Sequence, residues 1–190
     1  MLCIGVFGFM PISPGLAADS GDAANVRRCI KCHAEDGLEN GDGEPFIAAQ
    51  PFAYIVAVLD AYQVGTRVEK SMNKATKTLT REEKETAARY FSGLSNKYPR
   101  QPFDPQLAAK GASLHARLCE KCHVEGGRGF SMQNTPGPIL AGQSARYLQA
   151  QFGQFMSLDR EMPSNMGVAM LELVPGDTSA LVHYYVSRGQ

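Results

Sequence analysis

The chain has 190 residues, enough for one domain or for two small ones. It carries 19 Lys and Arg against 19 Asp and Glu, and this balance argues against a nucleic-acid partner, which normally requires a basic face. No bulk charge therefore steers the protein toward a partner.

Residues 1–18, MLCIGVFGFMPISPGLAA, contain no charged side chain and end in small residues. This composition predicts a secretory signal peptide and export to the periplasm. Because the usual basic start is absent, the segment is either an atypical signal or the inner part of a longer one. Pro11 and Pro14 interrupt a short apolar run, so an integral membrane span is not expected. Cys3 would leave with this segment.

The four remaining cysteines form two Cys-x-x-Cys-His motifs, Cys29 to His33 and Cys119 to His123, ninety positions apart. In this motif the thiols bond covalently to a haem, and the histidine becomes a ligand of its iron. Paired cysteines also bind zinc or exchange disulfides, but zinc pairs usually lie about fifteen to twenty residues apart. We therefore predict two covalently bound haem c groups. Their predicted attachment residues are Cys29, Cys32, Cys119 and Cys122, and the predicted iron ligands are His33 and His123.

Hydrophobic periodicity predicts helices and no convincing strand. In the first half we expect a helix over about 54–63 and another that starts at the capping box of Thr80 and Glu83 and ends before Gly93. Pro99, Pro102 and Pro105 mark a linker. In the second half, the predicted helices are one that carries Leu107, Gly111, Leu114 and Leu118, one over about 147–155, and one over about 177–187.

The two halves repeat one another around the motifs. Gly21 corresponds to Gly111 at an offset of ninety, and Tyr54 corresponds to Tyr147 at an offset of ninety-three. Pro45 and Pro138 correspond as well, and a carbonyl there can accept a hydrogen bond from the ligand imidazole. These matches predict an internal duplication, with all-α domains around one haem each. The predicted boundaries are 1–18 for the signal, 19–96 and 107–190 for the domains, and 97–106 for the linker.

A second iron ligand is expected from methionine in each half. Met72 is the only methionine of the first half beyond the signal segment. The second half offers Met132, Met156, Met162, Met166 and Met170. When the two halves are aligned, Met72 corresponds to Met166. Met162 is the alternative, because it follows Cys122 by forty positions, as Met72 follows Cys32. A thioether ligand raises the haem potential, so both haems are expected to be electron carriers.

Several charged residues cluster in the first half. The basic ones are Arg67, Lys70, Lys74, Lys77, Arg81 and Lys84. This run is either a solvated helix face or a basic rim that docks an acidic redox partner. His115 and His183 have no counterpart in the other half and are expected on helix surfaces or in packing positions.

The segment LHARLCEKCHVEGG, at 114–127, is followed by Ile139-Leu-Ala-Gly-Gln143 and Tyr147-Leu-Gln149. These residues closely resemble the dihaem cytochrome subunit of flavocytochrome c sulfide dehydrogenase. The resemblance implies two tandem cytochrome c-like domains related by a pseudo-twofold axis. It also implies a heterodimer with an FAD-containing flavoprotein that oxidises sulfide in the periplasm. His33, Met72, His123 and Met166 then match the axial ligands of that family.

Three functions stay open at this point. In the first, this chain takes electrons from the partner's FAD and passes them to a soluble cytochrome or another acceptor, with no catalysis of its own. The second is a free dihaem shuttle, since the same plan resembles the small two-haem cytochromes that serve bacterial terminal oxidases. The third is a dihaem peroxidase, which needs one iron without a strong distal ligand. Two methionine-ligated spectra would exclude it.

Overall fold

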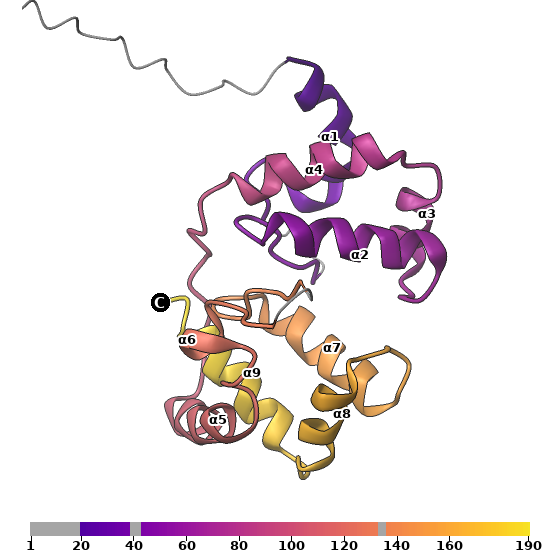
Figure 1. Ribbon diagram of the computed structural model, residues 1–190. Helices are drawn as coiled ribbons and strands as arrows, with labels where there is room; N and C mark the ends of the chain where they lie inside the picture. Colours follow the sequence, from indigo (N-terminus) through magenta and orange to yellow (C-terminus); the bar gives the residue numbers. More distant parts are fainter. Residues whose placement is uncertain (1–19, 39–42, 133–135) are drawn as a thin grey trace, which may run out of the picture.

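A computed structural model describes residues 20–38, 43–132 and 136–190, and this part of the chain folds into helices and loops without a strand (Figure 1). The all-α prediction is thereby confirmed. The predicted signal segment and Cys3 lie outside the described residues. Within those residues, no helix is both long enough and apolar enough to cross a membrane.

Four helices form the first half: α1 (Ser20–His33), α2 (Phe52–Val64), α3 (Lys70–Thr76) and α4 (Arg81–Ser92). Helix α4 packs against both α1 and α2, and α3 packs against α2. Burial of apolar side chains at this junction is the main force that holds the four helices together. The buried core consists of Val26, Ile55, Val56, Leu59, Ala87, Ala88 and Phe91.

The second half repeats this plan with α5 (Pro105–Leu118), α7 (Ala145–Met156), α8 (Ser164–Leu171) and α9 (Asp177–Ser187), and adds the short α6 (Val124–Gly127). Helices α5 and α9 make the closest crossing. A Cβ atom on Gly111 would lie 2.1 Å from the Ala180 carbonyl oxygen, so only glycine permits this approach. A separate core fills this half: Leu114, Leu148, Ala180, Leu181, Val182, Tyr185 and Val186.

The predicted helices are confirmed with small shifts at their ends. Thr80 and Glu83 form the expected capping box at the start of α4. Helix α5 starts earlier than the apolar pattern indicates, at Pro105, because the Asp104 side chain accepts the backbone N–H groups of the first turn. Helices α3 and α8, which carry Met72 and Met166, were not predicted. They are too short to show a hydrophobic period.

The two halves meet through a symmetrical pair of glutamines. The amide of Gln143 bonds to both backbone groups of Phe46: its Oε1 accepts the N–H at 2.6 Å and its Nε2 donates to the carbonyl at 2.8 Å. Gln50 holds Ile139 in the same way, at 3.0 and 2.9 Å. Each pair of corresponding residues is ninety-three positions apart. The joint therefore has the twofold pseudosymmetry that the resemblance implies.

Candidate functional site

The first Cys-x-x-Cys-His motif occupies the last turn of α1. Cys29 is half-buried against the first core, Cys32 is exposed, and His33 is buried. Burial lowers the pKa of His33, an effect that the Pro45 carbonyl and Glu44 oppose. Its Nδ1 is buried without a well-formed hydrogen bond. The imidazole is thus kept neutral, as an iron ligand must be.

The second motif follows the end of α5. Cys119 packs against the second core, and both it and Cys122 are partly buried. Burial, assisted by nearby His115, lowers the pKa of His123 to about 4. Its Nδ1 is also buried and without a partner. The two motifs therefore present the same set of groups: two thiols and one neutral, under-bonded imidazole.

The loop behind each motif is closed by a glycine carbonyl. The Gly37 carbonyl accepts the N–H of Ala48 at 3.1 Å, and the Gly127 carbonyl accepts that of Ala141 at 3.0 Å. Both glycines have positive φ, and a Cβ on Gly37 would lie 2.8 Å from the Ala48 nitrogen. Glycine is required there because the chain turns back on itself within van der Waals distance.

Met72 lies near the first motif. It sits on α3, where the Glu69 side chain accepts its backbone N–H, and it packs against the same core as Cys29. In the second half, the residue before Met166 reaches the motif: the Asn165 amide lies 3.9 Å from the Cys122 sulfur and 3.5 Å from that of Met132. The start of α8 is therefore close to the second motif.

The other methionines of the second half lie in different surroundings. Met170 is buried, and Met156 is 51% exposed at the end of α7. Met162 is half-buried in the segment between α7 and α8. Met132 lies beside Asn165, which the spacing argument did not indicate. The choice between Met166 and Met162 as iron ligand stays a prediction.

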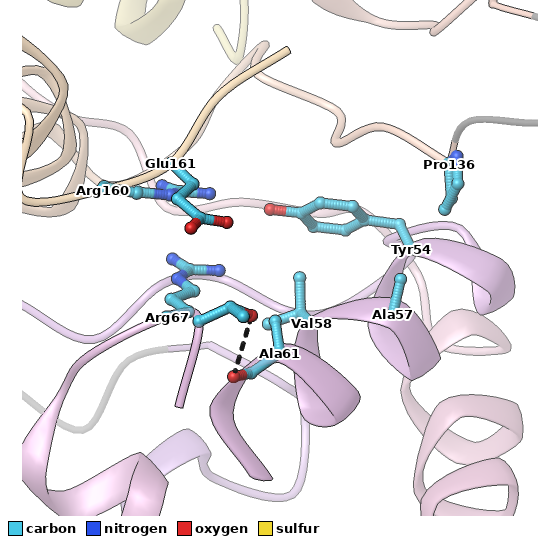
Figure 2. A pocket seen from close by; sticks show the side chains of 9 residues that line it. Tyr54, Ala57, Val58, Ala61, Arg67, Pro136, Arg160 and Glu161 are labelled. Atoms are coloured by element: carbon cyan, nitrogen blue, oxygen red, sulfur yellow. Dashed lines mark hydrogen bonds between the residues drawn. The ribbon is translucent and has the colours of Figure 1, made fainter. Parts of the chain in front are cut away.

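Two arginines cross the joint between the halves in matching ways. Arg67 stacks on Tyr62 of its own half and donates to the Tyr147 hydroxyl of the other at 2.5 Å. Arg160 stacks on Phe155 of its own half. In Figure 2 it lies on the same side of the cavity as the Tyr54 hydroxyl. Burial raises the pKa of Tyr54, and the positive charge of Arg160 offsets part of that rise.

These arginines line a cavity of about 200 Å³ between α2 and the segment before α8 (Figure 2). Arg67 is only 6% exposed, and no carboxylate of the described residues forms an ion pair with it, although Glu161 lines the same cavity. A buried guanidinium without a counter-ion is costly. A haem brings carboxylates of its own, so the positive charge at this joint suits the predicted cofactor, as the thiols and imidazoles of the two motifs do.

The arginine pair was missed at the sequence level, although the sequence contained its signal. Arg67 and Arg160 are separated by the same ninety-three positions as Tyr54 and Tyr147. Within the basic run, Arg67 was one charge among six. The structure separates this run: Arg67 and Lys84 are buried, and Lys84 bonds to Asp60 at 2.5 Å.

His115 is also more than a packing residue. It is 1% exposed, and its ring nitrogens lie 2.9 Å from the Tyr185 hydroxyl and 2.5 Å from a Glu120 carboxylate oxygen. The same tyrosine interacts with the Cys119 thiol. A polar network thus runs from the protein surface at Glu120 to a cysteine of the second motif.

No protein-family model matches the sequence. The chain is 26% identical over 174 residues to the thiosulfate dehydrogenase electron acceptor of Stutzerimonas stutzeri (strain A1501), covering 85% of this chain and 79% of that protein. The crystal structure of reduced recombinant cytochrome c4 from Pseudomonas stutzeri superimposes with a TM-score of 0.75 at 25% identity, covering 90% and 97% of the two chains. The chain has the duplicated class I cytochrome c fold.

Thiosulfate dehydrogenase (TsdBA) from Marichromatium purpuratum matches with a TM-score of 0.70 and 27% identity, over 90% of this chain and 39% of that one. Together these similarities support a dihaem c-type cytochrome that transfers electrons and carries covalently bound haem c. They do not confirm sulfide dehydrogenase, an FAD-containing partner or export.

Proposed function

We propose that this chain is the dihaem electron acceptor of a dehydrogenase for an inorganic sulfur compound, in the first place thiosulfate. The observation that carries this proposal is the pair of matched Cys-x-x-Cys-His motifs on two helical units joined by Gln50 and Gln143. The similarity to the Stutzerimonas stutzeri electron acceptor, which extends over both units, supports this choice of substrate. The protein would act in the periplasm after removal of residues 1–18, with domains at 19–96 and 107–190.

Each unit has a defined set of residues for its cofactor. Cys29, Cys32, Cys119 and Cys122 would attach the two haems, His33 and His123 would bind the irons on one side, and Met72 and Met166 on the other. When bound, haem supplies reversible one-electron storage at its iron. Desolvation lowers the pKa of both imidazoles, so both are neutral at pH 7, the form that binds iron. Arg67 and Arg160 offer positive charge at the joint, where haem carboxylates need it.

No bond-making step belongs to this chain. The substrate is oxidised on a partner, and the chain accepts the electrons and passes them to a soluble cytochrome or another acceptor. Because the joint is held by hydrogen bonds from both units, the two cofactors would keep a fixed relation during this transfer.

Two other functions have specific support. The run CEKCHVEGG with ILAGQ favours the cytochrome subunit of a flavocytochrome c sulfide dehydrogenase, with FAD on the partner. The similarity to cytochrome c4 over 97% of that chain favours a free shuttle to a terminal oxidase.

The deciding experiment is purification of the protein from its native periplasm. We expect two haems per chain, a co-purifying partner subunit without flavin, and reduction of the haem spectrum by thiosulfate. Bound flavin with reduction by sulfide would support the flavocytochrome instead, and a monomer reduced by neither donor would support the shuttle. A chain without covalent haem would overturn all three functions.

The distal ligands have their own test. Leu in place of Met72, Met166 or Met162 should remove the far-red sulfur-to-iron absorption band of one haem where the methionine is a ligand. We expect this loss for Met72→Leu and Met166→Leu. Met162→Leu is the matched control, and loss of the band in this variant would reverse the assignment for the second haem.

A further inference from the structure

The short helix that carries each proposed distal ligand has a different outer face in the two units. Lys74 on α3 is exposed, and so is Lys77, the residue that directly follows the helix. The corresponding positions on α8, ninety-four residues later, are Val168 and Leu171, which are 63% and 88% exposed. Positions that are equivalent in the repeat and similarly open to water therefore carry positive charge in one unit and aliphatic side chains in the other.

The lysines of α3 are available to a partner. Lys70, Lys74 and Lys77 make no ion pair with any carboxylate in the described part of the chain. The other exposed cation nearby, Arg81, is held by Glu85 at 2.6 Å. Unpaired surface charges project their field into solvent, and they can steer an oppositely charged molecule before contact.

The charge around the two helices differs in sign. Residues 66–77 contain four basic side chains and one acidic, a net charge of +3. The acidic one, Glu69, is used internally: it accepts bonds from Ser71 and from the Met72 backbone. Residues 159–171 contain one basic and two acidic side chains, a net charge of −1. An acidic molecule is therefore attracted to α3 and weakly repelled from α8.

We propose that α3 of the first unit, through Lys70, Lys74 and Lys77, is the docking face for an acidic, transiently bound redox protein that exchanges electrons with the first haem. This inference rests on the proposed function, because it takes Met72 as a ligand of that iron. Lys74 is two residues from Met72 on the same short helix, so a molecule held there lies beside the first redox centre. A contact dominated by charge gives fast association and rapid release, as an electron carrier requires.

The test uses the reduced holoprotein and hexacyanoferrate(III), a trivalent anion, in stopped-flow mixing at low ionic strength. Lys74→Glu with Lys77→Glu should slow the oxidation of one of the two haems about tenfold, and the difference should shrink as salt is added. The trivalent cation tris(phenanthroline)cobalt(III) should show the opposite change. The matched control is Lys97→Glu with Arg100→Glu, which makes the same change of charge at exposed positions in the segment before α5. It should alter the rate much less.

The reverse substitution places lysines at the equivalent positions of α8. Val168→Lys with Leu171→Lys should speed the reaction of the other haem with hexacyanoferrate(III). Equal effects of the α3 variant and its control, or rates independent of salt, would overturn the proposal. Lys74→Ala with Lys77→Ala, which should give a smaller change in the same direction, covers the case in which the glutamate variant fails to fold. A wrong proposed function would appear separately, as absent haem or as another donor in the purification.

Discussion

In the first unit, the position behind the haem motif is taken by Phe91, whose ring meets His33 edge-on with centroids 6.5 Å apart. In the second unit, the corresponding residue is Tyr185, which bonds to His115 and is buried to 1% exposure. The joint shows the opposite pattern, because its glutamines, arginines and tyrosines correspond pair by pair. Features that hold the units together were thus retained, whereas the surroundings of each motif and the outer helix faces diverged. The two units thus share one architecture but surround their Cys-x-x-Cys-His motifs with different side chains.

The largest expected effect is the loss of one of the two haems. Ala in place of Cys29 and Cys32, or of Cys119 and Cys122, should leave one haem per chain instead of two, measured as haem per polypeptide. Each core is a separate cluster, so the untouched unit should keep its spectrum and its unfolding transition. Loss of both haems from either variant would show that the units fold only together.

The next effect probes the crossing of α5 and α9. Gly111→Ala would place a Cβ 2.1 Å from the Ala180 carbonyl oxygen, and overpacking against backbone costs about 3 kcal/mol or more. Chemical denaturation of the holoprotein should show this loss in the transition of the second unit. Gly153→Ala is the control, since a Cβ there would meet no atom within 4 Å apart from its chain neighbours and the nearby backbone of its own helix. Gly153 is an exposed position within α7, and alanine there should stabilise by about 0.5–1 kcal/mol.

The symmetry of the joint can be tested by comparing its two glutamines. Gln143→Ala leaves both backbone groups of Phe46 unpaired in a fully buried place, whereas Gln50→Ala exposes those of Ile139, which is half-buried. We expect losses of about 2–3 and about 1 kcal/mol respectively, read from denaturation midpoints. Equal losses of stability in the two variants would show that burial does not determine how much each pair of hydrogen bonds contributes.

Much of the architecture could be predicted from sequence, because the signals were local or repeated. The capping box at Thr80 and the apolar period before Cys119 fix helices by interactions within a few residues. The partnerships of Arg67 and His115 could not be predicted, since they depend on residues about seventy to eighty positions away that only the fold brings together. The exposure of Lys74 and the burial of Lys84, ten residues apart in one basic run, depend in the same way on how α3 and α4 pack.

The smallest expected effect concerns two carboxylates that lie in the first turns of α9 and α4. Asp177 pairs with Lys110 at 2.7 Å and accepts the Val174 N–H, and these bonds lower its pKa. The corresponding Glu83 has its pKa lowered by bonds to Thr80. Each carboxylate therefore stabilises the fold above its ordinary pKa, and this contribution is lost as the pH falls through the lowered value.

Asp177 is 5% exposed and Glu83 is 29% exposed, so solvent screens the second carboxylate more. Asp177→Asn should lower the melting temperature at pH 7 by about 2–4 °C, and Glu83→Gln by less. From pH 7 down to pH 2 the melting temperatures of the variant and the unaltered protein should converge, because protonation of Asp177 removes the same interaction. An undiminished difference at pH 2 would mean that the asparagine disturbs packing at the start of α9 rather than charge.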